Sequence, residues 1–374
     1  MRTLPEDRRW PPSQGNLPTP PRGTRPLVWP NLAKAGCILL VVMMHLGEQI
    51  AHMPWANQAE LAAAWHVVNG FIRPVRMPLF FLVSGILASD SIMEPRPDTQ
   101  RSRLVKPLYL YFVWATIYQI LAPIDPVGWW FEVAMTNRFL PALLLTQVSW
   151  YLVALGMYYL LTRITLSLPV WTTLLLCAVL SVLGTVFEGQ LAAHEPKMLR
   201  CAIFFVAGVR MKGEVLAFVE RATASRVLVL GAAYLVGAAV ALKSDTFLLP
   251  VDILAVAAGA MLCMLIARRG SALIRPASWL AKRTLPIYLM HFLLMPALSF
   301  TIERWAAPLL GSIWVGAAYP LLAVPLLVAG CLAGHVVLVR TRAAEWLLDL
   351  PTWRMPGQLA VEGRSIPVSL KMAA

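Results

Sequence analysis

Charged residues are scarce in this chain of 374 residues. They make up 14% of the sequence, against 59% for hydrophobic residues, whereas a soluble globular chain averages about 25% charged residues. A water-soluble protein of this length must cover more of its surface with polar groups than this composition provides. The composition therefore argues against a soluble protein and predicts that lipid is the main solvent.

The chain also lacks the cysteine patterns of a disulfide-bonded or metal-binding protein. Its five cysteines form no CxxC pair and no Cys/His ligand spacing, and all of them lie in apolar segments, where free cysteine behaves as a small hydrophobic residue. We expect no disulfide, no metal site and no tightly bound cofactor.

The two ends of the chain differ from its middle. The first 30 residues are rich in proline and contain no apolar stretch long enough for the core of a signal peptide. We expect residues 1–27 to be a disordered, basic, proline-rich cytoplasmic tail and residues 341–374 to be a second cytoplasmic tail, with the membrane domain at 28–340.

About 20 apolar residues are needed to cross the hydrocarbon core of a membrane as a helix. This criterion predicts an all-α, polytopic transmembrane bundle of about ten helices in the inner or plasma membrane. The net charge of +13 comes mostly from Lys and Arg in alternate connections, which by the positive-inside rule places both termini in the cytoplasm. No nucleic-acid-binding module is visible, so we expect no nucleic-acid partner. The predicted segments are 31–50, 67–89, 104–122, 143–163, 168–187, 198–211, 226–242, 246–267, 279–300 and 311–339.

Ionisable groups inside membrane segments are costly and are therefore candidate functional residues. Lys34 and His45 are 11 positions apart in the first segment, which places them on one helix face about 16 Å apart along the axis. His45 suits general-base work near neutral pH, and Glu48, three positions on, can orient it. The alternative is a lysine that snorkels to the interface and a histidine that meets lipid headgroups.

Three further clusters combine polar groups with the ends of helices. Arg73 and Arg76 precede the apolar part of the second segment and could bind an anionic group or anchor the helix at the interface. Tyr288 and His291 share a helix face in the ninth segment, either for substrate or as a hydrogen-bonded pair in the bundle. Arg103 and Lys106, at the start of the third segment, could hold a phosphate or simply be cytoplasmic loop charge, and Trp150 opens the fourth segment as an interfacial aromatic residue does.

Taken in order, these segments resemble acyltransferase family three, the membrane acyltransferases that acylate envelope glycans and lipids. The resemblance spans about residues 28–340. It departs from the family at Asn31, where the family often has Asp, and at Lys34 and Lys106, where Arg is the commoner residue. The matching features are Lys34 and His45 in the first helix, Met77 to Phe81 with Ser84-Gly85 in the second, Arg103 and Lys106 at the third, Trp150 to Leu152 in a middle helix, and Tyr288 to His291 near the end.

The resemblance implies an acyl-coenzyme A (acyl-CoA) donor, with acetyl-CoA the expected co-substrate, bound from the cytoplasm. The acceptor would be a hydroxyl of a carbohydrate or glycolipid on the far side. His45 would be the catalytic base, and Lys34, Arg103 and Lys106 would serve the donor. Arg73 and Arg76 would stabilise the oxyanion or orient an anionic acceptor, beside Trp150, Tyr288 and His291.

Two other classes of protein fit parts of the sequence. A transporter or flippase would also carry ionisable groups among about ten helices, although the inverted repeat and paired broken helices that favour it are not visible. A non-catalytic membrane scaffold gives no reason for Lys34 and His45 to share a face.

Overall fold

The computed structural model describes residues 28–95, 98–121, 149–188, 190, 194–241, 248–270 and 272–351, and these residues form helices and no strand. The predicted tail at 1–27 and the part of the second tail after residue 351 lie outside the described residues. The longer helices are α1 (Trp29–Gln49), α2 (Gln58–Met93), α3 (Lys106–Leu121), α6 (Trp150–Ile164), α7 (Val170–Val186), α8 (Glu195–Arg210), α10 (Ala224–Ala241), α11 (Leu248–Arg268), α13 (Thr284–Trp305) and α15 (Ile313–Arg340). The shorter ones are η1 (Ile50–His52), η2 (Arg101–Val105), η4 (Thr165–Ser167), α9 (Lys212–Glu220), α12 (Ile274–Ala281), α14 (Ala307–Leu310) and α16 (Ala344–Leu347).

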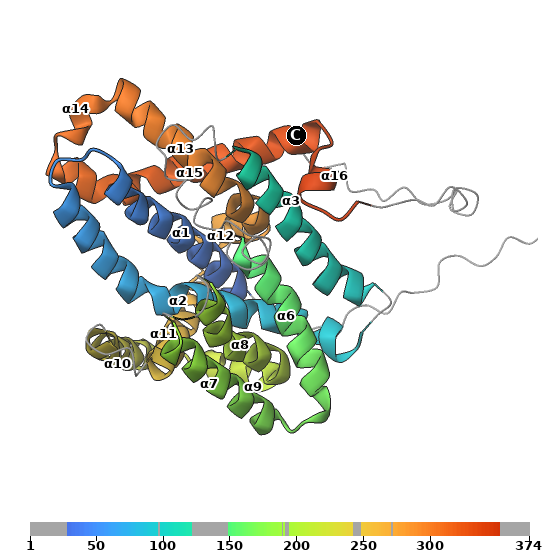
Figure 1. The fold of residues 1–374 in the computed structure, drawn as a ribbon. Coiled ribbons are helices and arrows are strands. Elements are labelled where there is room, and N and C mark those ends of the chain that lie inside the picture. Colours follow the sequence, from blue (N-terminus) through green and yellow to red (C-terminus); the bar gives the residue numbers. More distant parts are fainter. Residues whose placement is uncertain are drawn as a thin grey trace, which may run out of the picture.

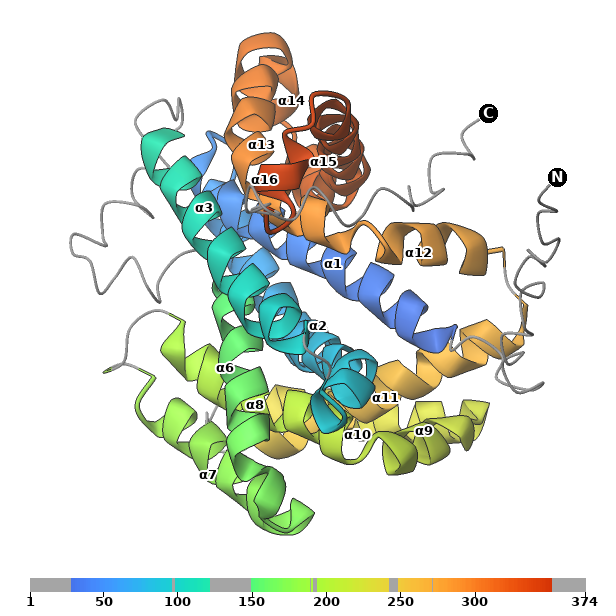
Figure 2. The ribbon, with the colours of Figure 1, turned by 90° about the vertical axis from the view of Figure 1, so that its right-hand side faces the viewer.

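Helix α1 is the centre of the bundle. It contacts α2, α11, α12, α13 and α15, with α13 to α15 on one side of it and α7 to α11 on the other (Figures 1 and 2). Its buried face includes Ile38, Val42 and Leu46, which are spaced four residues apart and so line one stripe of the helix. Some polar side chains of α1 also lie inside the bundle, because Gln49 is fully buried and the imidazole of His45 is mostly buried.

Each of the ten predicted segments overlaps a helix. Within the described residues, six helices are long and apolar enough to cross a membrane: Trp29–His52, Gln58–Met93, Ala224–Ala241, Leu248–Arg268, Thr284–Trp305 and Ile313–Arg340. The other four segments correspond to α3, α6, α7 and α8, which have 15 to 17 residues each. At about 1.5 Å per residue these four are shorter than the roughly 30 Å hydrocarbon core.

Helix α2 is much longer than the predicted segment 67–89. It has 36 residues, or about 54 Å at 1.5 Å per residue. Its first turns form because they pack on the start of α15: the indole nitrogen of Trp65 donates to the carbonyl of Ala317 at 3.1 Å, and Leu61 lies against Gly316. The predicted segment began too late, at residue 67, because these contacts and not hydropathy extend the helix to Gln58.

Helices α2 and α8 approach each other closely at two glycines. A methyl group on Gly85 would collide with the carbonyl of Phe205, and one on Gly208 would collide with the carbonyl of Leu82. Small residues at such a crossing let two backbones come together. Gly85 thus serves helix packing, and the crossing brings the basic residues of α2 near those of α8.

Large apolar side chains cover the outward faces of several helices. Leu228 and Val236 on α10 and Leu321 and Leu326 on α15 are each more than half exposed. Contiguous exposed apolar surface of this kind is rare on soluble proteins. With the long apolar helices, it supports a multi-pass membrane protein.

The last described residues fold back onto α3. The indole nitrogen of Trp114 donates to the carbonyl of Leu347 at 2.7 Å, and the amine of Lys106 lies 2.8 Å from the carboxylate of Asp349. The predicted C-terminal tail thus begins with a docked segment, residues 344–351, that closes over the start of α3.

Candidate active site

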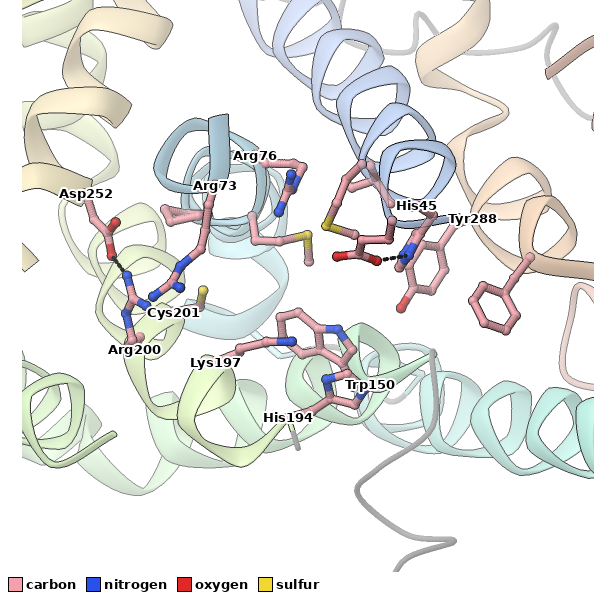
Figure 3. Close-up of a pocket in the computed structure, with 16 residues that line it drawn as sticks. His45, Arg73, Arg76, Trp150, His194, Lys197, Arg200, Cys201, Asp252 and Tyr288 are labelled. Carbon is pink, nitrogen blue, oxygen red and sulfur yellow. Dashed lines mark hydrogen bonds and ion pairs between the residues drawn. The ribbon is translucent and has the colours of Figure 1, made fainter. Parts of the chain in front are cut away.

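A cavity of about 240 Å³ lies beside the end of α1, and we call it the His45 cavity. Figure 3 shows that α1, α2, α6, α8, α11 and α13 all contribute side chains to its wall. It is smaller than the about 300–1,000 Å³ typical of pockets for drug-sized ligands. Its polar and aromatic lining is His45 and Glu48 (α1), Arg73 and Arg76 (α2), Trp150 (α6), Lys197 and Arg200 (α8), Asp252 (α11) and Tyr288 and Phe292 (α13), with His194 just before α8.

His45 and Glu48 form the pair predicted from their spacing. The Nδ1 atom of His45 lies 3.1 Å from Oε2 of Glu48, and the imidazole is mostly buried while the carboxylate is half exposed. Carboxylate partners orient an imidazole and favour the tautomer whose Nδ1 carries the proton. With Nδ1 donating to Glu48, Nε2 keeps the free lone pair that a general base needs.

His291 supports His45 from the neighbouring helix. It is fully buried, and its ring centroid lies 5.4 Å from that of His45. Its Nδ1 lies 3.0 Å from the carbonyl of Ile287, which assigns the proton to Nδ1. Its Nε2 has no hydrogen-bond partner among the described residues. His291 is therefore behind His45 and not on the cavity wall.

The part of the cavity wall formed by α2 and α8 is strongly basic. Arg76 is buried, with 6% of its surface exposed, and its Nε and one terminal nitrogen have no hydrogen-bond partner in the described part of the chain. Arg200 donates to the carboxylate of Asp252 at 2.9 Å, with both side chains buried. Both predicted arginines of α2, Arg73 and Arg76, thus line this cavity together with His45.

Lys197, Arg200 and Asp252 were not singled out from the sequence. Two of them carried a usable signal: Arg200 lies in the sixth predicted segment, and Asp252 is an acid inside the apolar run of α11. Ionisable residues inside such runs are candidates for functional sites. Lys197 precedes the sixth segment as an ordinary loop charge would, so only the packing of α8 against α2 reveals it.

A family model described as an acyltransferase domain, that of acyltransferase family 3, matches residues 27–339. The chain belongs to acyltransferase family 3. No curated protein and no solved structure matches it. The family favours an acyltransferase over the transporter or scaffold that the composition also allows.

The predicted donor residues of this family member share a second cavity, of about 260 Å³, which we call the Lys34 cavity. Lys34, Arg103 and Lys106 all line it. The Nε atom of Arg103 donates to the hydroxyl of Ser91 at 3.1 Å, and Lys106 is paired with Asp349. The rest of the lining is mainly apolar or aromatic, which suits a ligand with both anionic and apolar parts.

Tyr288 lies between the two cavities and lines both of them. Its hydroxyl accepts a hydrogen bond from the backbone N–H of Tyr151 at 3.3 Å, and the Tyr151 hydroxyl is 2.8 Å from that of Ser84. Trp150 is the first residue of α6, and residues 143–148 of the predicted fourth segment lie outside the described residues. The ring of Trp150 stacks on His194 with ring centroids 5.9 Å apart. The acyltransferase domain therefore has two adjoining cavities along α1, with one tyrosine at their junction.

Proposed function

We propose that this acyltransferase moves an acyl group, in the first instance acetyl, from acyl-CoA to a hydroxyl of an envelope carbohydrate or glycolipid. The main support for the proposal is that α1 lines two cavities. One is basic and contains Lys34, the other contains the His45–Glu48 pair, and Tyr288 lines both of them. A transferase binds a donor and an acceptor, so it needs two sites close together.

The donor would occupy the Lys34 cavity. Lys34, Arg103 and Lys106 supply positive charge for the phosphates of acyl-CoA, and the apolar lining accepts its pantetheine arm and acyl group. The proposal places this cavity on the cytoplasmic side of the inner or plasma membrane, where acyl-CoA is made. The thioester then lies toward Tyr288.

The acceptor would occupy the His45 cavity. His45 Nε2 accepts the proton of the acceptor hydroxyl while its oxygen attacks the thioester carbonyl. The carbon–sulfur bond then breaks, and the proton passes from His45 to the leaving thiolate, which gives an ester and free CoA. Glu48 stabilises the imidazolium that forms between these two steps, and Arg73 and Arg76 stabilise the oxyanion or orient an anionic acceptor.

The test is thioester consumption by membranes that contain the full chain. His45→Gln keeps a polar side chain but removes the base, so we expect the rate of acceptor-dependent CoA release to fall about a hundredfold to ten-thousandfold. The matched control is His66→Gln, because His66 is exposed on α2 and lines neither cavity. Wild-type turnover by a folded His45→Gln protein would exclude His45 as the base.

A further inference from the structure

On the basic wall of the His45 cavity, more buried hydrogen-bond donors than acceptors lack a partner among the described residues. On this wall, Arg73, Arg76 and Arg200 each have at least one buried side-chain nitrogen without a hydrogen-bond partner among the described residues. The unpartnered buried acceptor on the same wall is Oδ1 of Asp252. A buried donor left without a partner costs free energy, and a charged one costs more than a neutral one.

The charges of the cavity show which of these cations are available to a ligand. Asp252 already neutralises Arg200. Glu48 contacts a neutral His45, so its single charge offsets only one of the other cations. Arg73, Arg76 and Lys197 remain, and no ion pair joins any of them to an acid in the described part of the chain. The wall therefore carries an excess of positive charge directed into a cavity.

We infer that this wall binds a phosphate or carboxylate group of the acceptor, so that the substrate is an acidic or phosphorylated sugar or glycolipid. The inference rests on the proposed function and names the class of its acceptor. The guanidinium fork of Arg76 matches two oxygens of such a group, and water is a weaker partner for a buried cation.

The same charges fix the direction in which the acceptor binds. Glu48, which is on α1 and also lines the cavity, repels an anion. Arg73 and Arg76 on α2 and Lys197 on α8 attract it, and Figure 3 shows them on the cavity wall apart from His45. The anionic group binds at the α2–α8 wall, which leaves the hydroxyl end of the molecule toward His45. Recognition of the anion and activation of the hydroxyl are thus assigned to opposite walls.

The experiment is a thermal-shift titration of the detergent-purified full chain, because a ligand that binds only the folded state raises the melting temperature. The probes are inorganic phosphate, glucose 6-phosphate and glucuronate, with glucose as the neutral match, and dodecyl phosphate as a lipid-like phosphate. We expect the charged probes to bind and Arg76→Gln to weaken them about tenfold to a hundredfold. Arg304→Gln is the matched control, since Arg304 is exposed at the end of α13, outside both cavities.

Each outcome decides the inference. A shift with glucose 6-phosphate or glucuronate supports a water-soluble anionic acceptor, and a shift with dodecyl phosphate alone supports a lipid-linked one. Equal shifts with glucose and glucose 6-phosphate, or charged-probe shifts that Arg76→Gln leaves unchanged, would overturn it. If Arg76→Gln does not fold, Lys197→Gln replaces it, because Lys197 has an exposed side chain and its loss leaves the helix packing intact.

The same preparation separates this inference from the proposed function. Acetyl-CoA is titrated in parallel, and its binding depends on the Lys34 cavity and not on Arg76. Anion binding without acetyl-CoA binding would preserve the anion site and contradict the acyltransferase. Acetyl-CoA binding without anion binding would leave the acyltransferase standing and remove the anionic acceptor.

Discussion

The two cavities along α1 are each lined by several cationic side chains, but these side chains differ in whether they already have partners in the protein. In the Lys34 cavity, Arg103 and Lys106 already have protein partners, Ser91 and Asp349. In the His45 cavity, Arg73 and Arg76 keep buried nitrogens without a partner among the described residues. A ligand of the first cavity must share or displace the existing contacts of Arg103 and Lys106, although Lys34 has no ion pair among the described residues. A ligand of the second cavity supplies partners that Arg73 and Arg76 lack.

The largest effect expected from this comparison, beyond removal of His45 itself, comes from Glu48. Glu48→Gln removes the charge that stabilises an imidazolium at His45, so we expect kcat to fall about tenfold to a hundredfold with little change in acetyl-CoA affinity. Steady-state kinetics of CoA release measure both quantities. An unchanged kcat would mean that Glu48 is only a surface neighbour of His45, 52% exposed.

A smaller effect tests the contact that sets the basic walls of α2 and α8 opposite each other. Gly85→Ala places a methyl group against the carbonyl of Phe205, and overpacking of this kind costs about 1–3 kcal/mol. The melting temperature should fall. Gly36→Ala is the matched control, because a methyl group there meets nothing within 4 Å and alanine favours the helix. Equal melting temperatures for the two variants would contradict the close approach of α2 and α8.

The smallest effect concerns the docked segment 344–351 at the Lys34 cavity. Burial raises the pKa of Asp349, but the hydrogen bonds from Lys106 and the backbone N–H of Leu350, together with the charges of Lys106 and Arg101, outweigh burial. The pKa of Asp349 therefore lies below its usual value. A depressed carboxylate pKa stabilises the folded contact at pH values above about 4, and this stabilisation is lost as the pH falls through the folded pKa. Hydrogen exchange in residues 344–351 should therefore quicken, beyond its intrinsic pH dependence, only below about pH 4.

Two variants check the origin of that pH dependence. Asp349→Asn should raise exchange in the segment at pH 7 and abolish the acid transition. Glu345→Gln, in the same segment and exposed, should leave both unchanged. An acid transition that persists in Asp349→Asn would assign it to another group.

Local spacing predicts one part of the site well. Lys34, His45 and Glu48 lie on one helix, so the helical repeat alone places them, and the structure brings His45 and Glu48 to 3.1 Å. Tyr288 and His291 also share α13, but only the packing of α13 against α1 shows that Tyr288 lines both cavities while His291 lies behind His45. Residues on one helix are therefore predictable, and their tertiary partners are less so.

Other features depend on contacts between distant segments. Hydropathy finds the core of α2, but Trp65 and its contact with Ala317 extend the helix to Gln58. Lys197 resembles any loop cation until the Gly85–Gly208 crossing brings α8 against α2. Composition likewise predicts ten apolar segments, but only the structure shows how long each helix is. Six helices of the described residues are long enough to cross a membrane.

The separation of a donor cavity at Lys34 from an acceptor cavity at Arg76 is tested by one binding measurement on purified protein. Acetyl-CoA and glucose 6-phosphate are each titrated against wild type, Lys34→Gln and Arg76→Gln. We expect Lys34→Gln to weaken acetyl-CoA binding about tenfold and to leave binding of the phosphate ester unchanged, and we expect Arg76→Gln to do the reverse. Two separate sites on α1 and α2 would then serve donor and acceptor. If both variants weaken binding of the same ligand, or if acetyl-CoA does not bind to the wild-type protein, the assignment of donor and acceptor to separate cavities is wrong.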